Sequence, residues 1–256
     1  MKLHAGQYEQ ALASLDQARS NVARHPHVLG LLHQAYYGLR DWDQLGALLP
    51  ELKKHKVLPD DALQQLEREV HAQLLQQSAA GDNGAALDNL HTRWQKMPAR
   101  LKQDPQMLRG YVGMLIAADA HASAEKVILR ALKQQWDSAL VRQYGYVQSD
   151  NVPRQLARAE SWLTEHPEDA QLLLCLGRLS ARDKLWGKAR DYFESSYRVE
   201  RSAETCAELG RLLIALGEPK VAAAYYREGL LLSQGDLPAL PMPEKMLPHG
   251  NRLVHS

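Results

Sequence analysis

The sequence contains little cysteine and phenylalanine and no long apolar run. Its 256 residues include two cysteines, Cys175 and Cys206, and a single phenylalanine. Neither cysteine has another Cys or a His at the spacing of a zinc site, so we expect two structural thiols in a helical core and no metal site. No run reaches the roughly 18 apolar residues of a membrane-spanning helix, and no signal-peptide pattern is visible. The sequence as given therefore predicts no membrane span.

An excess of charge of one sign is also missing. The chain has 31 Lys and Arg against 30 Asp and Glu, which leaves a net charge of +1. This balance gives no general attraction to nucleic acid or to an anionic membrane, so we predict neither as a partner. The sequence also lacks a phosphate loop, a Gly-x-Ser-x-Gly elbow and a His-Glu-x-x-His pair, and we predict a protein without enzymatic activity.

What the sequence does contain is one pattern written twice in its C-terminal part. The word Leu-Gly-Arg-Leu occurs at 176–179 and again at 209–212, so Gly177 and Gly210 lie 33 residues apart. Each copy continues with an alanine in mid-unit and an aromatic residue four positions later. We expect each glycine to lie where the first helix of a hairpin comes closest to the second. The offset and the order of residues resemble the tetratricopeptide repeat, whose period is about 34 residues.

The repeat predicts an all-α fold, a right-handed α-solenoid of tetratricopeptide-like helical hairpins with about 12–13 helices. We expect this superhelix over residues 1–234 and a disordered tail at 235–256, where prolines are frequent. The expected units are a partial repeat at 1–20, a repeat at 26–55, a degenerate or inserted hairpin at 59–98, a repeat at 104–135, a divergent hairpin at 137–165, and repeats at 169–200 and 203–233. Because an unpaired hairpin half cannot bury its apolar face, the partial repeat predicts further sequence on its N-terminal side.

Several short sequence motifs narrow the resemblance to one family of repeat proteins. They are His25-Pro26 before Val28-Leu29, Gln34-Ala35-Tyr36, Trp42 with Leu48-Leu49-Pro50, and Leu176-Gly177 with Trp186. Together with the order of strong and degenerate units, these words resemble the HemY-type tetratricopeptide proteins of proteobacteria over most of residues 1–234. The porphyrinogen oxidases that share this name are flavoenzymes with a Gly-x-Gly-x-x-Gly loop, which is absent from this sequence.

The resemblance implies a function and a location. HemY-type proteins are held in the bacterial inner membrane by an N-terminal hydrophobic anchor, with the repeats on the cytoplasmic side, and are associated with late protohaem biosynthesis. This sequence contains no such anchor. We therefore expect a non-enzymatic scaffold that organises haem-biosynthesis enzymes such as ferrochelatase and requires no cofactor. Two alternatives stay open, which are direct binding or delivery of haem or protoporphyrin, and an adaptor for envelope assembly.

The candidate binding residues follow from the repeat positions. The first helices line the concave face of a superhelix, and the positions one step off their buried stripe face the groove. The residues that we expect to contact a partner are Gln34, Tyr37, Arg109, Arg178 and Arg211. Arginines at matched positions suit bidentate contacts to carboxylates, from an acidic peptide or from porphyrin propionates. The alternative is that each arginine is solvated and paired with a nearby Asp or Glu.

A haem contact would use the densest group of histidines. His25, His27 and His33 lie within one short segment, and His33 is close in sequence to two tyrosines. An exposed His beside an apolar wall is what haem ligation requires. The alternative interpretation is a set of turn and surface histidines.

Overall fold

The structure is a computed structural model that describes residues 25–80 and 84–234. Throughout these ranges the regular structure is helical and no strand occurs. The expected partial repeat at 1–20 and the tail at 235–256 lie outside the described residues.

Thirteen α-helices and one short 3-10 helix make up the described ranges. They are α2 (Pro26–Leu39), α3 (Trp42–Lys54), α4 (Asp60–Ala79), α5 (Gly84–Lys96), α6 (Ala99–Lys102), α7 (Pro105–Ala117), α8 (His121–Leu132), α9 (Ser138–Tyr144), α10 (Val152–Ser161), η1 (Trp162–Thr164), α11 (Ala170–Arg182), α12 (Trp186–Val199), α13 (Ala203–Ala215) and α14 (Pro219–Gln234). The expected fold class, an all-α solenoid of tetratricopeptide-like hairpins, is confirmed.

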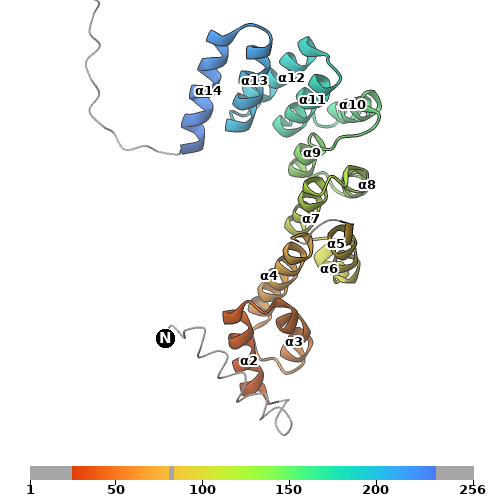
Figure 1. Ribbon diagram of the computed structural model, residues 1–256, viewed down its shortest axis with the longest axis vertical. Coiled ribbons are helices and arrows are strands. Elements are labelled where there is room, and N and C mark those ends of the chain that lie inside the picture. The colour runs from red at the N-terminus through yellow and green to blue at the C-terminus, as the bar shows by residue number, and fades with distance from the viewer. Residues whose placement is uncertain (1–24, 81–83, 235–256) are drawn as a thin grey trace, which may run out of the picture.

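The helices form an open arc. Neighbours in sequence pack together as hairpins, such as α2 with α3, α7 with α8, α11 with α12 and α13 with α14. In Figure 1, α4, α7 and α9 follow the inner edge of the arc, while α5, α6, α8 and α10 lie on its outer side. The first helices therefore line the hollow of the arc, as the sequence pattern predicts.

Side-chain caps explain why the helices begin where they do. Asp104 accepts hydrogen bonds from the backbone N–H groups of the first turn of α7, and Asp137 and Asp169 do the same for α9 and α11. Asn151 caps α10 and Ser202 caps α13. A side-chain oxygen at the N-cap satisfies N–H groups that have no partner within the helix.

The two glycines of the repeated word lie at the closest helix contacts. A Cβ atom at Gly177 would lie 2.3 Å from the ring of Phe193, and one at Gly210 would lie 2.5 Å from the ring of Tyr226. The expectation that small residues set the spacing of these hairpins is confirmed. Both cysteines are buried in the same helices, and burial raises the pKa of the Cys175 thiol to about 12, as expected for core residues.

The apolar core is divided into three clusters along the arc. One joins α2, α3 and α4, a second extends from the end of α4 to α11, and a third lies between α11, α12 and α13. Within the described part of the chain, no helix combines the length and hydropathy needed to cross a membrane.

Candidate partner-binding groove

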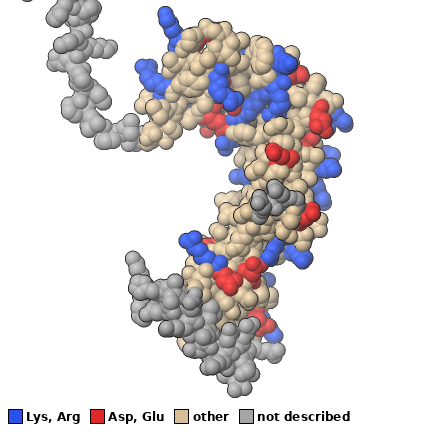
Figure 2. All heavy atoms as spheres, in the orientation of Figure 1, with Lys and Arg blue, Asp and Glu red and all other residues tan. Residues whose placement is uncertain are grey.

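On the inner side of the arc, a groove opens between α11, α12, α13 and the turn that follows α9. It has a volume of about 520 Å³, and the residues that line it include Tyr146, Arg178, Arg182, Trp186, Arg211 and Leu212. Lys and Arg side chains gather on this side of the C-terminal helices in Figure 2. We call this site the cationic groove.

Arg178 is the fixed centre of the groove. Its side chain is 7% exposed, and its Nε donates a hydrogen bond of 2.9 Å to Glu208. Its Nη2 bonds to Glu204 and, at 3.1 Å, to the hydroxyl of Tyr146. The guanidinium also lies 4.2 Å from the centre of the Tyr146 ring. Burial alone would lower the pKa of Arg178, but the two carboxylates raise it above its ordinary value, so the charge is retained.

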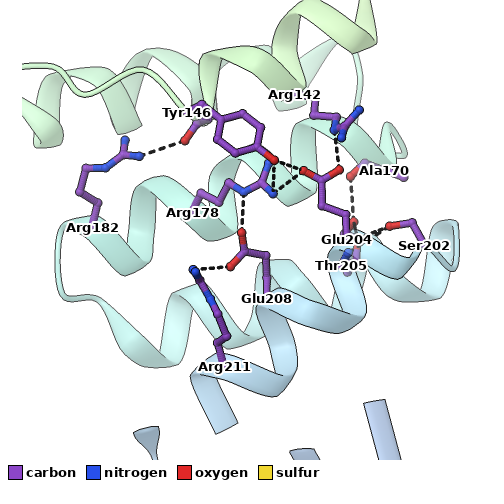
Figure 3. A network of polar contacts seen from close by, with 12 residues as sticks. Arg142, Tyr146, Ala170, Arg178, Arg182, Ser202, Glu204, Thr205, Glu208 and Arg211 are labelled. Carbon is purple, nitrogen blue, oxygen red and sulfur yellow. Dashed lines mark hydrogen bonds and ion pairs between the residues drawn. The ribbon is translucent and has the colours of Figure 1, made fainter. Parts of the chain in front are cut away.

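Glu204 and Glu208 each form ion pairs with two arginines (Figure 3). Glu204 pairs with Arg142 as well as Arg178, and it accepts a hydrogen bond from Tyr146. Burial would raise the pKa of Glu204, but these partners lower it below its ordinary value. Glu208 pairs with Arg178 at 2.9 Å and with Arg211 at 2.6 Å, and the Arg211 side chain is 74% exposed.

Arg182 differs from the other arginines of the groove. Its Nη1 and Nη2 donate to the backbone oxygens of Val147 and Gly145 at 2.9 and 3.0 Å. No carboxylate in residues 25–80 or 84–234 forms an ion pair with it. Burial, together with the nearby charge of Arg178, lowers the pKa of Arg182.

The charges of the groove do not balance. Arg142, Arg178 and Arg211 share Glu204 and Glu208, and Arg182 adds a further charge without a carboxylate of its own. Four arginines against two glutamates leave an excess of two positive charges. An arrangement of this kind attracts carboxylate groups, and a guanidinium binds them in a defined orientation.

Two of the predicted arginines meet in this groove and the third does not. Glu208 joins Arg178 and Arg211, whereas Arg109 lies on α7 with its Nε and Nη2 both 2.9 Å from Asp137. Arg178 lines the groove, but it is buried and its own chain already supplies carboxylates, so its contact with a partner stays a prediction. Arg178 holds Glu204 and Glu208 in place.

The other predicted contact residues lie at the far end of the arc. Gln34 and Tyr37 are exposed on α2, and the Tyr37 hydroxyl donates a 2.9 Å hydrogen bond to Glu69. They stay predictions for a second part of the concave face, separate from the cationic groove (Figure 1).

The three histidines are not brought together as a ligand set. His25 caps α2 by accepting a 3.3 Å hydrogen bond from the backbone N–H of His27, and both side chains are exposed. His33 is half-buried, which lowers its pKa, and its ring centre lies 6.2 Å from that of Tyr37. Across the described ranges, no group of three or more His, Cys, Asp or Glu is arranged to hold a metal ion. Haem contact at these histidines stays a prediction.

The sequence reasoning missed most of the cationic groove. The missed residues are Arg142, Tyr146, Arg182, Trp186, Glu204 and Glu208. The signal that was available is spacing, because Arg142 and Tyr146, Arg178 and Arg182, and Glu204 and Glu208 are each four residues apart. Residues four apart lie on the same face of a helix, so each pair marks one face of its segment.

Comparisons with known proteins find similarity in sequence to HemY proteins. No protein-family model matches the chain. The chain is 27% identical over 234 residues to Protein HemY of Escherichia coli, a match that covers 91% of this chain and 58% of that protein. Protein HemY of Shigella flexneri matches to the same extent. This chain therefore spans 58% of the length of the curated relatives that it matches.

Similar solved structures are more distant. A MamA double mutant of strain RS-1 is 17% identical with a TM-score of 0.44, covering 69% of this chain and 96% of that one. The crystal structure of yeast Tom70 is 15% identical with a TM-score of 0.40, covering 89% of this chain and 45% of that one. The sequence match confirms the resemblance of this chain to HemY-type proteins over 91% of its length.

Proposed function

We propose that this chain is a non-enzymatic scaffold that organises late protohaem-biosynthesis enzymes, ferrochelatase among them, on the cytoplasmic side of the bacterial inner membrane. The pathway and the location come from the resemblance to HemY-type proteins. The observation that carries the scaffold role is the excess of positive charge in the cationic groove, on the inner side of the arc.

The groove has the side chains that dominate protein interfaces. Tyr146 is 42% exposed and Trp186 is 47% exposed, beside the exposed guanidinium of Arg211. Trp, Tyr and Arg are the residue types most often responsible for binding energy in protein complexes. A solenoid presents such residues on an extended concave surface, which suits a partner segment that follows the arc.

Affinity capture from bacterial membranes tests this proposal. The chain, an Arg211→Glu variant and an Arg198→Glu variant serve as baits, and recovered proteins are identified by mass spectrometry. Arg198 is a matched control because it is exposed on α12 and, among the residues that the structure describes, its side chain bonds only to Ser195 and to a backbone oxygen. We expect ferrochelatase or another late haem enzyme with the wild-type and Arg198→Glu baits and a depleted yield with Arg211→Glu. Recovery of no haem enzyme with any bait would contradict the proposal.

Direct binding of a tetrapyrrole is a second candidate, favoured by the same groove. Haem and protoporphyrin each carry a planar aromatic ring and two carboxylates, which suit exposed Tyr146 and Trp186 beside two uncompensated positive charges. A haemin titration followed by absorbance tests it, with Arg211→Glu and His33→Ala variants alongside. Saturable binding with one haemin per chain that either variant weakens would support this candidate. Weak binding without saturation, unchanged by both variants, would leave proteins as the ligands of the groove.

An envelope-assembly adaptor is the remaining alternative. The same membrane capture separates it from the haem-pathway scaffold, since envelope proteins would then replace haem enzymes among the recovered partners.

A further inference from the structure

We propose that the cationic groove binds an acidic segment of a partner protein, in which two side-chain carboxylates flank an apolar or aromatic side chain. One carboxylate pairs with Arg182 and the other with Arg211. This proposal rests on the scaffold function above and names the chemistry of the segment that the groove recognises.

Arg182 provides the first carboxylate position. Two of its N–H groups are held by the backbone oxygens of Gly145 and Val147, which fix the guanidinium at the groove. An arginine side chain has five N–H groups, so three remain for a ligand. A half-buried guanidinium without a carboxylate partner is electrostatically unfavourable, and a carboxylate from outside the described residues removes that penalty.

Arg211 provides the second position. Its Nη2 bonds to Glu208, which Arg178 already engages through its Nε. A carboxylate shared between two guanidinium groups neutralises only one of the two charges. The Arg211 side chain is 74% exposed, so its remaining N–H groups are free to reach a partner.

Arg178 adds a further positive charge beside these two positions. It lines the groove, and its Nη1 has no hydrogen-bond partner among the residues that the structure describes. This nitrogen is closed to solvent, so Arg178 favours a carboxylate ligand through its positive charge rather than through a direct hydrogen bond.

The groove that holds the two arginines also has an apolar part. Ala181, Trp186, Leu212 and Ala215 line the same groove, and 47% of the Trp186 surface is exposed. An apolar or aromatic side chain of the ligand would cover this surface. A free phosphate or another small anion would leave it open to water.

A nucleic-acid backbone does not suit the site. The chain as a whole has a net charge of +1, and two carboxylates lie among the arginines of the groove. Consecutive phosphates would meet these carboxylates, whereas side chains on an extended peptide can place their charges on either side of them.

Fluorescence anisotropy with a defined probe tests the proposal. The probe is a fluorescein-labelled peptide with the motif Glu-Leu-Trp-Glu between Gly-Ser ends, amidated at its C-terminus so that every carboxylate belongs to a side chain. A second probe has Gln in place of each Glu. We expect saturable binding of the acidic probe and at least about tenfold weaker binding of the Gln probe, because charged hydrogen bonds are lost. Equal affinity for both probes would overturn the proposal.

Variants of the chain locate the site. Arg182→Gln and Arg211→Gln are each expected to weaken binding of the acidic probe by about tenfold, whereas Arg198→Gln leaves it unchanged. Arg182→Lys restores part of the affinity, since the charge remains but the planar fork is lost. Arg211 is exposed, so its variant tests binding without disturbing the core. Unchanged affinity in both the Arg182→Gln and the Arg211→Gln variants would place the site elsewhere and overturn the proposal.

Failure of this proposal is distinguishable from failure of the scaffold function. Capture of haem enzymes that survives Arg182→Gln and Arg211→Gln, with no binding of the acidic probe, would overturn the acidic segment and leave the scaffold. Binding of the probe with no haem enzyme captured from membranes would overturn the scaffold function and leave the acidic segment as the ligand of the groove.

Discussion

At the scale of single residues, two glycines set the distance between the helices of the two strongest hairpins. Gly177 faces Phe193, which is 2% exposed and has no room to move away. Gly110 is the matched case, because it lies inside α7 and a Cβ there would meet nothing within 4 Å. Substitutions at the two sites therefore separate the effect of close packing on stability from the effect of helix propensity on stability.

We predict opposite effects for alanine at these two positions. Gly177→Ala should lower the free energy of unfolding by about 1–3 kcal/mol, because the added methyl group overpacks the contact with Phe193. Gly110→Ala should raise it by about 0.5–1 kcal/mol, because alanine is the better helix former. Urea unfolding followed by circular dichroism measures both. Equal effects at the two sites would show that the glycines are not needed for close approach.

Asp169 is a second residue on which the fold depends. It caps α11, and its Oδ2 accepts hydrogen bonds from Trp136 at 2.9 Å and from Ser138 at 2.5 Å, which join α11 to the start of α9. Burial would raise the pKa of Asp169, but these donors and the backbone N–H groups lower it below its ordinary value of 3.8. The lowered pKa means that the ionised carboxylate stabilises the folded chain. That stability is fully present above 3.8 and is lost as the pH falls through the folded-state pKa.

Asp169→Asn should therefore lower the free energy of unfolding at neutral pH by about 1–2 kcal/mol. The deficit should narrow as the pH falls below 3.8 and disappear below the lowered pKa of the folded chain, where the wild-type carboxylate is also protonated. Glu168→Gln is the control, because Glu168 is the exposed neighbour in the same turn. Urea unfolding at neutral pH and at a pH below 3.8 measures the difference in free energy of unfolding between each variant and the wild type. A deficit that is the same at neutral and acidic pH would rule out the charge as the cause.

At the scale of elements, four hairpins turn through a residue in the left-handed conformation. Arg40, Asp119, Lys184 and Gly217 have φ values of 56°, 54°, 61° and 82°, and each lies between the two helices of a hairpin. Glycine adopts this conformation without steric cost, whereas other residues are strained there. Gly217 is the only one of these four positions that has the favoured residue.

Exchanging residues between equivalent turns tests the free-energy cost of holding a residue other than glycine in the left-handed conformation. Lys184→Gly should raise the melting temperature, with a gain of about 0.5–1 kcal/mol, and Gly217→Ala should lower it by a similar amount. Both substitutions lie at exposed turns, so packing changes little. Thermal unfolding of the two variants against the wild type provides the measurement. A loss of stability in Lys184→Gly would contradict the interpretation.

The same elements show how far the sequence could predict the fold. The two C-terminal hairpins were predictable because Gly177 and Gly210 repeat with their aromatic partners at a fixed offset. The burial of Arg178 could not be predicted from the sequence. The residue that covers it, Tyr146, comes from the divergent hairpin at 137–165. Which helices share a groove depends on tertiary packing, so the pairing of Arg178 with Glu204 and Glu208 required the structure.

At the scale of the whole molecule, two helices connect the three core clusters. Leu74 of α4 belongs to the N-terminal cluster and Leu75 to the central one, while α11 contributes Leu174 to the C-terminal cluster and Leu176 to the central one. Residues 172–180 of α11 are all buried. The helix that positions Arg178 and Arg182 is thus the most enclosed part of the arc, which gives the cationic groove a rigid base.

The central claim is that a partner protein occupies the cationic groove. The most direct measurement is photo-crosslinking in bacterial membranes, with a crosslinking amino acid at Ala215, which lines the groove, or at Ala224, an exposed residue on α14 outside it. We predict a protein adduct from Ala215 that disappears when Arg182→Gln and Arg211→Gln are combined in the same chain. An adduct from Ala224 alone, or one from Ala215 that persists in the double variant, would contradict the claim.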